Sequence, residues 1–185
     1  MFLKLVSAGA LAFAPVPASV DKPDGLFVDF PMVKQVDCGL SRGTGFYAGG
    51  RFISASHVTD IPCWVSGVPL NQTHEPGLDF SSEPAPVAGY KINCEGFKEG
   101  ETYFAIGFAH GNPVQRMLFV AGTGEKNDTG LAVLWGSPTF IPGMSGGPLL
   151  NARGEVVGIV NKFIRFMPIS LSREMRDTSL CKDKA

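Results

Sequence analysis

Ser145 lies in a glycine-rich segment that has the composition of a nucleophile loop. The segment reads Gly143-Met144-Ser145-Gly146-Gly147-Pro148 and precedes an apolar hairpin sequence. Glycines let the backbone approach a substrate carbonyl closely, and they leave amide N–H groups free to point at it. A serine hydroxyl is nonetheless a poor nucleophile unless a neighbouring imidazole accepts its proton. The segment therefore predicts acyl-transfer chemistry only if the chain also supplies a histidine and a carboxylate.

His57 is the histidine best placed to act as the base. It follows a predicted β-hairpin whose turn is Gly49-Gly50, and it stands at the mouth of the next loop. Histidine titrates near neutral pH, as a general base requires. His74, in a proline-rich stretch, and His110, in a turn, are the alternatives.

The carboxylate partner is predicted to be Asp79, in Gly77-Leu78-Asp79-Phe80. A buried carboxylate beside the histidine fixes the tautomer of the ring and stabilises its charged form. Asp60 is a rival, but it is only three residues from His57 and would struggle to reach the far ring nitrogen. Asp128, flanked by Asn127 and Thr129, is typical of a solvated turn.

The elements that must position these residues are predicted to be short β-strands. The chain holds 23 glycines and 14 prolines, which divide it into short runs and favour an all-β protein. The stretch 70–86 is expected to be loop, and a short helix is expected from Ser170 to Leu180. The predicted strands cover 45–48, 51–54, 87–92, 102–108, 114–120, 131–134, 149–150 and 156–160.

Four segments together resemble the chymotrypsin- and trypsin-like serine proteases, most closely the HtrA-like bacterial and viral members. They are Gly43–Phe46, Ile53–Val58, Leu78–Phe80 and Gly143–Asn151, in the order histidine, aspartate, serine. The segments 154–159 and 166–169 also fit the HtrA-like pattern. The resemblance covers about residues 34–176; the Ser145 segment is highly specific, whereas the Asp79 segment lacks the usual apolar alternation.

The resemblance implies a serine endopeptidase with two six-stranded antiparallel β-barrels and its site between them. Ser145 would attack the peptide carbonyl, His57 would shuttle the proton, and Asp79 would orient His57. The backbone amides of Gly143 and Ser145 would bind the oxyanion. We expect an N-lobe over about 19–92 and a C-lobe over about 93–185, with the seam between Pro84 and Glu101.

Two positions depart from the digestive and clotting enzymes. Met144 replaces the aspartate that pairs there with a newly cut N-terminus, so we expect activity without such cleavage. The resemblance implies that Thr139 would stand at the floor of the specificity pocket and that Val160 and Asn161 would lie on its wall. The floor carries no charge, and the wall lacks the histidine of Glu/Gln-specific relatives. A preference for small or medium apolar residues is therefore expected.

The N-terminal segment indicates export. An apolar run from Leu5 to Ala14 follows Lys4; it is too short to span a bilayer, and small residues precede a possible cut before Ser19. Residues 1–18 are therefore predicted to be a signal peptide, and the protein to be secreted or periplasmic. An apolar N-terminal strand or helix packed on the domain is the alternative, as is the cytoplasm of an infected host cell for a viral protease.

Charge and cysteine spacing limit the partners. Sixteen basic and 17 acidic residues leave a net charge of −1, so nucleic acid is not expected, and the partner is a protein or peptide substrate. Cys38, Cys63, Cys94 and Cys181 lack metal-ligand spacing, and neither metal nor cofactor is expected. Four cysteines allow three pairings, and in an exported chain Cys38–Cys63 is one hypothesis. The oligomeric state is left open.

Two other function classes compete. One is a catalytically inactive relative that serves as a binding module, although decay usually removes the histidine or the serine. The other is an esterase or similar serine hydrolase. Such enzymes place a helix after the nucleophile, whereas Pro148 and the β-branched run that includes Val156 and Ile159 predict a hairpin.

Overall fold

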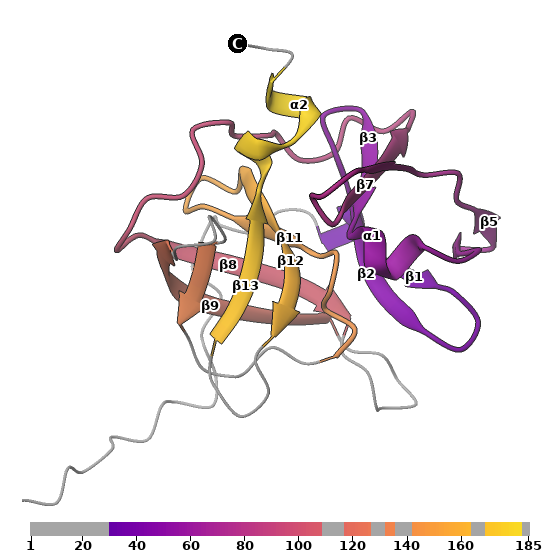
Figure 1. Ribbon diagram of the computed structural model, residues 1–185, viewed down its shortest axis with the longest axis horizontal. Helices are drawn as coiled ribbons and strands as arrows, with labels where there is room; N and C mark the ends of the chain where they lie inside the picture. The colour runs from indigo at the N-terminus through magenta and orange to yellow at the C-terminus, as the bar shows by residue number, and fades with distance from the viewer. Residues whose placement is uncertain (1–29, 109–116, 127–131, 136–141, 164–168, 183–185) are drawn as a thin grey trace, which may run out of the picture.

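The computed structural model describes residues 30–108, 117–126, 132–135, 142–163 and 169–182. Its regular structure is mostly antiparallel β-sheet with a few short helices, which confirms the predicted fold class at that level. Figure 1 shows two groups of strands side by side, an N-terminal group in purple and a C-terminal group in red, orange and yellow.

The N-terminal sheet has seven strands in the order β5-β4-β1-β2-β3-β7-β6. A 3-10 helix, η1 (Phe30–Met32), precedes it, and the short helix α1 (Ser56–Thr59) follows β3. The strands are β1 (Val33–Asp37), β2 (Arg42–Ala48), β3 (Arg51–Ser54), β4 (Trp64–Val65), β5 (Val68–Pro69), β6 (Thr73–Glu75) and β7 (Phe80–Pro84).

The C-terminal strands form a closed barrel in the order β10-β13-β12-β11-β8-β9. After its last strand, the chain continues through the 3-10 helix η2 (Met175–Asp177) into the helix α2 (Ser179–Lys182). The strands are β8 (Thr102–Phe108), β9 (Met117–Lys126), β10 (Ala132–Trp135), β11 (Pro148–Leu150), β12 (Val156–Phe163) and β13 (Ile169–Glu174).

The finer expectation of two six-stranded barrels is not confirmed by the described residues. Among the described residues, the C-terminal sheet is closed with six strands, whereas the N-terminal sheet has seven, with β5 and β6 at its ends. The first sheet ends at Pro84 and the second begins at Thr102.

Several predicted elements are present where the sequence indicated them. β2 and β3 form the hairpin around Gly49-Gly50, which have φ of 56° and 75°. Both values lie in the left-handed region that such a tight turn needs. β8 has the predicted bounds 102–108, and β11 and β12 form the hairpin after Ser145.

The expectation of a loop over 70–86 is wrong, because this stretch contains β6 and β7. Their backbones pair from Thr73 opposite Ser82 to Glu75 opposite Phe80. Apolar alternation is missing because β7 buries hydroxyl groups, and hydrogen bonds satisfy them: Ser81 Oγ lies 2.8 Å from Thr59 Oγ1. Burying a serine costs little free energy when its hydroxyl is hydrogen-bonded. Such a serine interrupts the apolar alternation from which a strand is predicted.

The expected helix from Ser170 is also wrong over most of its length. Residues 169–174 form β13, which pairs with β10 on one side and β12 on the other. Only α2, at Ser179–Lys182, is helical in the α sense. Pairing on both sides supplies more hydrogen bonds than a short isolated helix, so tertiary context overrides the local signal. The predicted strand 87–92 forms only isolated bridges at Tyr90 and Ile92.

Two disulfides and a hydrogen-bonded carboxylate connect distant segments. Cys38 pairs with Cys63, as hypothesised, and Cys94 pairs with Cys181, a bridge that the sequence left open. Glu75 of the N-terminal sheet accepts hydrogen bonds from Ser179 N–H at 3.1 Å and Ser179 Oγ at 2.6 Å. These links attach the C-terminal helix to the rest of the molecule. No helix in the described ranges combines the length and apolar character needed to span a bilayer.

Candidate active site

The fold presents His57 on a short helix that is anchored on both sides of the histidine. β3 runs into Ala55, and α1 begins at the next residue. Ser56 Oγ donates to the carbonyl oxygen of Phe80 at 2.9 Å, and Val58 is buried in the core. The imidazole between these anchors remains 42% exposed. The local sequence thus fixes the backbone and leaves the ring at the surface.

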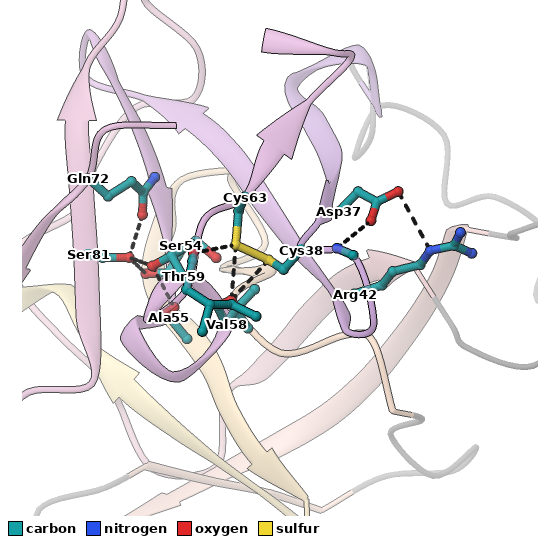
Figure 2. The surroundings of a disulfide bond; sticks show 12 residues. Asp37, Cys38, Arg42, Ser54, Ala55, Val58, Thr59, Cys63, Gln72 and Ser81 are labelled. Atoms are coloured by element: carbon teal, nitrogen blue, oxygen red, sulfur yellow. Dashed lines mark hydrogen bonds and ion pairs between the residues drawn. A yellow bond between two sulfur atoms is a disulfide. The ribbon is translucent and has the colours of Figure 1, made fainter. Parts of the chain in front are cut away.

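A disulfide supports the other face of this helix. Figure 2 shows the Cys38–Cys63 bridge beside Val58. The two cysteines and Val58 belong to one buried cluster. Because Cys38 follows β1 and Cys63 precedes β4, the bridge closes the chain around the segment that carries His57.

Asp79 lies against His57 and binds it through both ring and backbone. The His57 N–H donates to Asp79 Oδ1 at 2.9 Å, and Nδ1 lies 3.0 Å from Oδ1 and 2.9 Å from Oδ2. A carboxylate in this position favours the tautomer with hydrogen on Nδ1, which leaves Nε2 free to accept a proton. His57 and Asp79 are therefore brought together in the arrangement that a general base needs.

The backbone of Asp79 is held in an unusual conformation. Its φ is 38°, in the left-handed region that few non-glycine residues adopt, although aspartate tolerates it best. The residue follows the turn after β6, and Phe80, which follows it, is fully buried. Such outliers persist where surrounding contacts determine them, and they are concentrated at functional sites.

The pKa of Asp79 lies below its usual value. Burial acts to raise the pKa, but the hydrogen bonds from the His57 side chain and backbone and from the Asn161 side chain lower it, as does the positive charge that His57 can carry. The donors therefore outweigh the burial. Asp79 is the negative partner of the pair at neutral pH.

Ser145 stands in the loop before β11, packed against the segment that leads to His57. Thr44 N–H donates to the Ser145 carbonyl at 2.9 Å. A Cβ added to Gly146 would lie 2.2 Å from the Thr44 carbonyl oxygen and 2.9 Å from the Ala55 nitrogen, so only glycine permits this approach. Ser145 Oγ donates to the Asn161 carbonyl oxygen at 3.3 Å. Among the described residues, no hydrogen bond joins Ser145 Oγ to the His57 ring.

The carbonyl groups of Gly143, Met144 and Ser145 accept hydrogen bonds, whereas the N–H groups of the same three residues donate none within the described ranges. Gly143 O accepts from Thr44 Oγ1 at 2.7 Å, and Met144 O accepts from Gly147 N–H at 3.0 Å. The N–H groups of Gly143 and Ser145 donate to no residue in the described ranges. These are the two amides that the sequence assigned to an oxyanion hole.

Asn161 takes a different place from the one expected. The sequence assigned it to the wall of the substrate pocket, but its side chain is buried and faces Asp79. Asn161 Nδ2 donates to Asp79 Oδ2 at 2.7 Å and to the Asp79 carbonyl oxygen at 3.1 Å. The backbone carbonyl of Asn161 accepts the hydrogen bond from Ser145 Oγ, so Asn161 lies between the aspartate and the serine. A buried asparagine at the end of the apolar run 156–160 is the signal that could have revealed this role.

The remaining candidates are separate from this group or lie outside the description. His74 pairs with Asp60, at 3.3 Å between Nδ1 and Oδ1, so the two rival residues contact each other. Val160 is buried in a cluster that also contains Met144. His110, Asp128 and Thr139 lie outside the described residues. Within the described ranges, no three His, Cys, Asp or Glu side chains are grouped to hold a metal ion.

The sequence was compared with models of known protein families. Residues 70–159, which include Asp79 and Ser145, match the family model of the trypsin-like peptidase domain. His57 lies before the matched segment. This segment, just under half of the chain, is similar to a trypsin-like peptidase domain. No curated protein matches the sequence.

Solved structures show that the trypsin-like fold extends over most of the chain. The active form of the Rv3671c protease from M. tuberculosis has a TM-score of 0.63 at 17% identity, with 83% of this chain and 80% of that chain covered. The serine endoprotease of Yersinia pestis has a TM-score of 0.62 at 20% identity, with 83% and 62% covered. The HtrA-type protease AlgW, solved with a tripeptide, has a TM-score of 0.60 at 20% identity, with 83% and 58% covered.

The chain spans about three fifths of the last two structures. At these identities the likeness concerns the fold. Together with the family match, it supports a serine-type peptidase with a trypsin-like domain.

Proposed function

We propose that this chain is a serine endopeptidase that cleaves peptide bonds through an acyl-enzyme on Ser145. The observation that carries the proposal is the bidentate contact between Asp79 and the Nδ1 edge of His57, next to the glycine-rich Ser145 loop. The family match over Asp79 and Ser145 supports it independently.

Acylation would begin with a rotation of the Ser145 side chain. Its hydroxyl leaves the Asn161 carbonyl and turns toward His57 Nε2, which accepts the proton as the oxygen attacks the substrate carbonyl. The tetrahedral oxyanion accepts hydrogen bonds from the amides of Gly143 and Ser145. The adduct then collapses as His57 donates the proton to the leaving amine, and the ester on Ser145 remains.

Deacylation repeats these steps with water as the nucleophile. His57 takes a proton from the water as its oxygen attacks the ester carbonyl, and then returns the proton to Ser145 Oγ. Throughout, Asp79 stays ionised and stabilises the imidazolium. Asn161 steadies Asp79 through its Nδ2 contacts.

Thr139, the residue assigned to the floor of the substrate pocket, carries no charge. We therefore propose that the pocket prefers small or medium apolar substrate side chains. Met144 is buried among apolar residues and offers no charge to a new N-terminus, so activity is proposed not to depend on N-terminal trimming. Both proposals concern protein or peptide substrates.

Export is the proposed location, in the periplasm or outside the cell. All four cysteines are paired, which is the usual state in an oxidising compartment and an uncommon one in the cytosol. The bridges favour export over the cytoplasm of an infected cell.

Labelling with a fluorophosphonate probe tests the mechanism, with Ser145→Ala and His57→Ala beside the wild type. Either change should lower the labelling rate drastically, because loss of nucleophile or base costs on the order of 10⁶ in kcat. The exposed Ser41 provides the matched control, and Ser41→Ala should label like the wild type. Equal labelling of wild type and Ser145→Ala would overturn the proposal. A wild type that folds but does not label would favour a binding module, and labelling without cleavage of quenched peptides would favour an esterase.

A further inference from the structure

Thr44 connects three segments through one buried side chain. It is fully buried on β2, in the N-terminal sheet. Its hydroxyl donates to the Gly143 carbonyl at 2.7 Å and accepts from Phe108 N–H, at the end of β8, at 2.9 Å. Its own N–H donates to the Ser145 carbonyl at 2.9 Å. The hydroxyl therefore uses both its donor and an acceptor position in contacts with the C-terminal half of the molecule.

These bonds fix the loop on both sides of the Met144–Ser145 peptide. Gly143 has φ of 101°, and a glycine in this region has no Cβ to restrict rotation of the following peptide. The orientation of that peptide therefore depends on contacts from outside the loop. Thr44 supplies one to that peptide, at the Gly143 carbonyl, and its N–H holds the Ser145–Gly146 peptide at the Ser145 carbonyl.

We infer that Thr44 is a positioning residue for the oxyanion-binding loop. By holding the carbonyls of Gly143 and Ser145, it fixes the peptides before and after the Met144–Ser145 peptide, so that the amides of Gly143 and Ser145 stay available to a substrate oxyanion. The inference rests on the proposed peptidase function and adds to it a residue from the other half of the fold.

The chemistry of the side chain predicts which kinetic quantity changes. Valine has the shape of threonine without its hydroxyl, so Thr44→Val leaves the Gly143 carbonyl and the Phe108 N–H without their partner. The oxyanion exists only in the transition state, so its misplaced donors affect the chemical step and not ground-state binding. A displacement of about 1 Å at a reacting centre can cost roughly a hundredfold in rate.

The test compares Thr44→Val with Thr44→Ser, which restores the hydroxyl, and with Thr178→Val as matched control. Thr178 is also fully buried and donates its hydroxyl to a backbone carbonyl, Met175 O at 2.7 Å, but in the C-terminal helical segment. Thr44→Val should lower kcat/KM for a peptide about ten- to a hundredfold. It should raise the Ki of a peptide aldehyde, which forms an oxyanion adduct, by the same factor. Thr44→Ser should recover most of the loss.

Ground-state binding is measured in the Ser145→Ala background. The Kd of the same peptide should agree within about twofold with and without Thr44→Val, since uniform binding is not affected. If Thr44→Val does not fold, Thr44→Ala, which leaves room for a water, must show the same selective loss.

Each outcome decides one claim. Unchanged kcat/KM in Thr44→Val, a loss that Thr44→Ser does not reverse, or an equal loss in Thr178→Val would each overturn the role of Thr44. A folded wild type that does not react with the fluorophosphonate probe would instead overturn the peptidase function. The two failures are therefore distinguishable.

Discussion

Asn161 uses both ends of its amide, and this gives it a fixed orientation. Nδ2 donates to Asp79 Oδ2 at 2.7 Å, while Oδ1 accepts from Arg173 N–H at 2.8 Å. A flipped amide would place oxygen against the carboxylate and a donor against a donor. Asparagine thus meets a requirement that neither aspartate nor an apolar residue could meet here.

We predict that Asn161→Ala lowers kcat/KM about tenfold, because a hydrogen bond to a charged group is worth roughly 1.5 kcal/mol or more. Asn161→Asp should lower it further, since a second carboxylate against Asp79 disfavours ionisation of the pair. Steady-state kinetics on a peptide substrate measure both, with Asn71→Ala, an exposed asparagine, as control. Equal activity of wild type and Asn161→Ala would refute the assigned contact.

The lowered pKa of Asp79 predicts a pH dependence of stability. A group whose folded pKa is depressed stabilises the protein above its unfolded pKa, near 3.9, and this contribution is lost as pH falls through the folded pKa. The free energy of unfolding of the wild type should therefore exceed that of Asp79→Asn at pH 7. This difference in free energy should become smaller below about pH 4. Urea denaturation at pH 7, 5 and 3 measures this. A gap that widens toward low pH would contradict the direction of the shift.

Sequence reasoning proposes as site residues those whose immediate neighbours in the chain form a distinctive local pattern. Ser145 is set among glycines, and His57 follows a glycine-turned hairpin, so each has a local signature. The contact of Asn161 with Asp79 spans 82 residues and has none. The Thr44 hydroxyl, which reaches 99 residues along the chain to Gly143, is equally hidden. Contacts of this length are set by the packing of two sheets, which a single sequence does not display.

At the scale of elements, buried polar groups explain what the pattern missed. Strand prediction succeeds where an aromatic and aliphatic run is bounded by turn residues, as in β8. It fails for β7, whose buried positions include Ser81 and Ser82, and for β13, where Ser172 and Glu174 are fully buried. Hydrogen bonds reach Ser81, Ser82 and Glu174 inside the fold, and hydrophobicity alone therefore misplaces these elements.

The two disulfides close loops of different length around different elements, so their removal should have different effects. Cys94–Cys181 spans 87 residues and Cys38–Cys63 spans 25. Loop entropy predicts about 4.6 kcal/mol for the longer bridge and about 3.5 kcal/mol for the shorter. The shorter loop contains His57. We predict that Cys94→Ala/Cys181→Ala loses more stability, whereas Cys38→Ala/Cys63→Ala loses more activity.

Denaturant midpoints and fluorophosphonate labelling rates of the folded variants measure these two effects. Each double variant serves as the control for the other, because both lose one bridge and gain two alanines. The prediction fails if one variant has the larger loss in both measurements.

At the scale of the whole molecule, one core joins the two sheets. The larger buried cluster contains Phe46, Ile53 and Phe80 from the N-terminal sheet together with Leu150 and Ile159 from the barrel. β1 and β2 also contact β8. The site lies where these parts meet, with His57 and Asp79 supplied by one sheet and Ser145 and Asn161 by the other. Its geometry therefore depends on both halves remaining docked.

This shared core predicts that the two sheets unfold in a single transition. Calorimetric and van't Hoff enthalpies should agree, and amide protection in β3 and β12 should be lost at the same denaturant concentration. Leu150→Ala removes a fully buried side chain of the shared core and should cost about 3 kcal/mol. Because the core is common, protection in β3 should fall as much as in β12, although Leu150 belongs to the barrel. Loss of protection confined to the barrel, or two separate transitions, would show that the halves fold independently and that the site is assembled from two separately stable lobes.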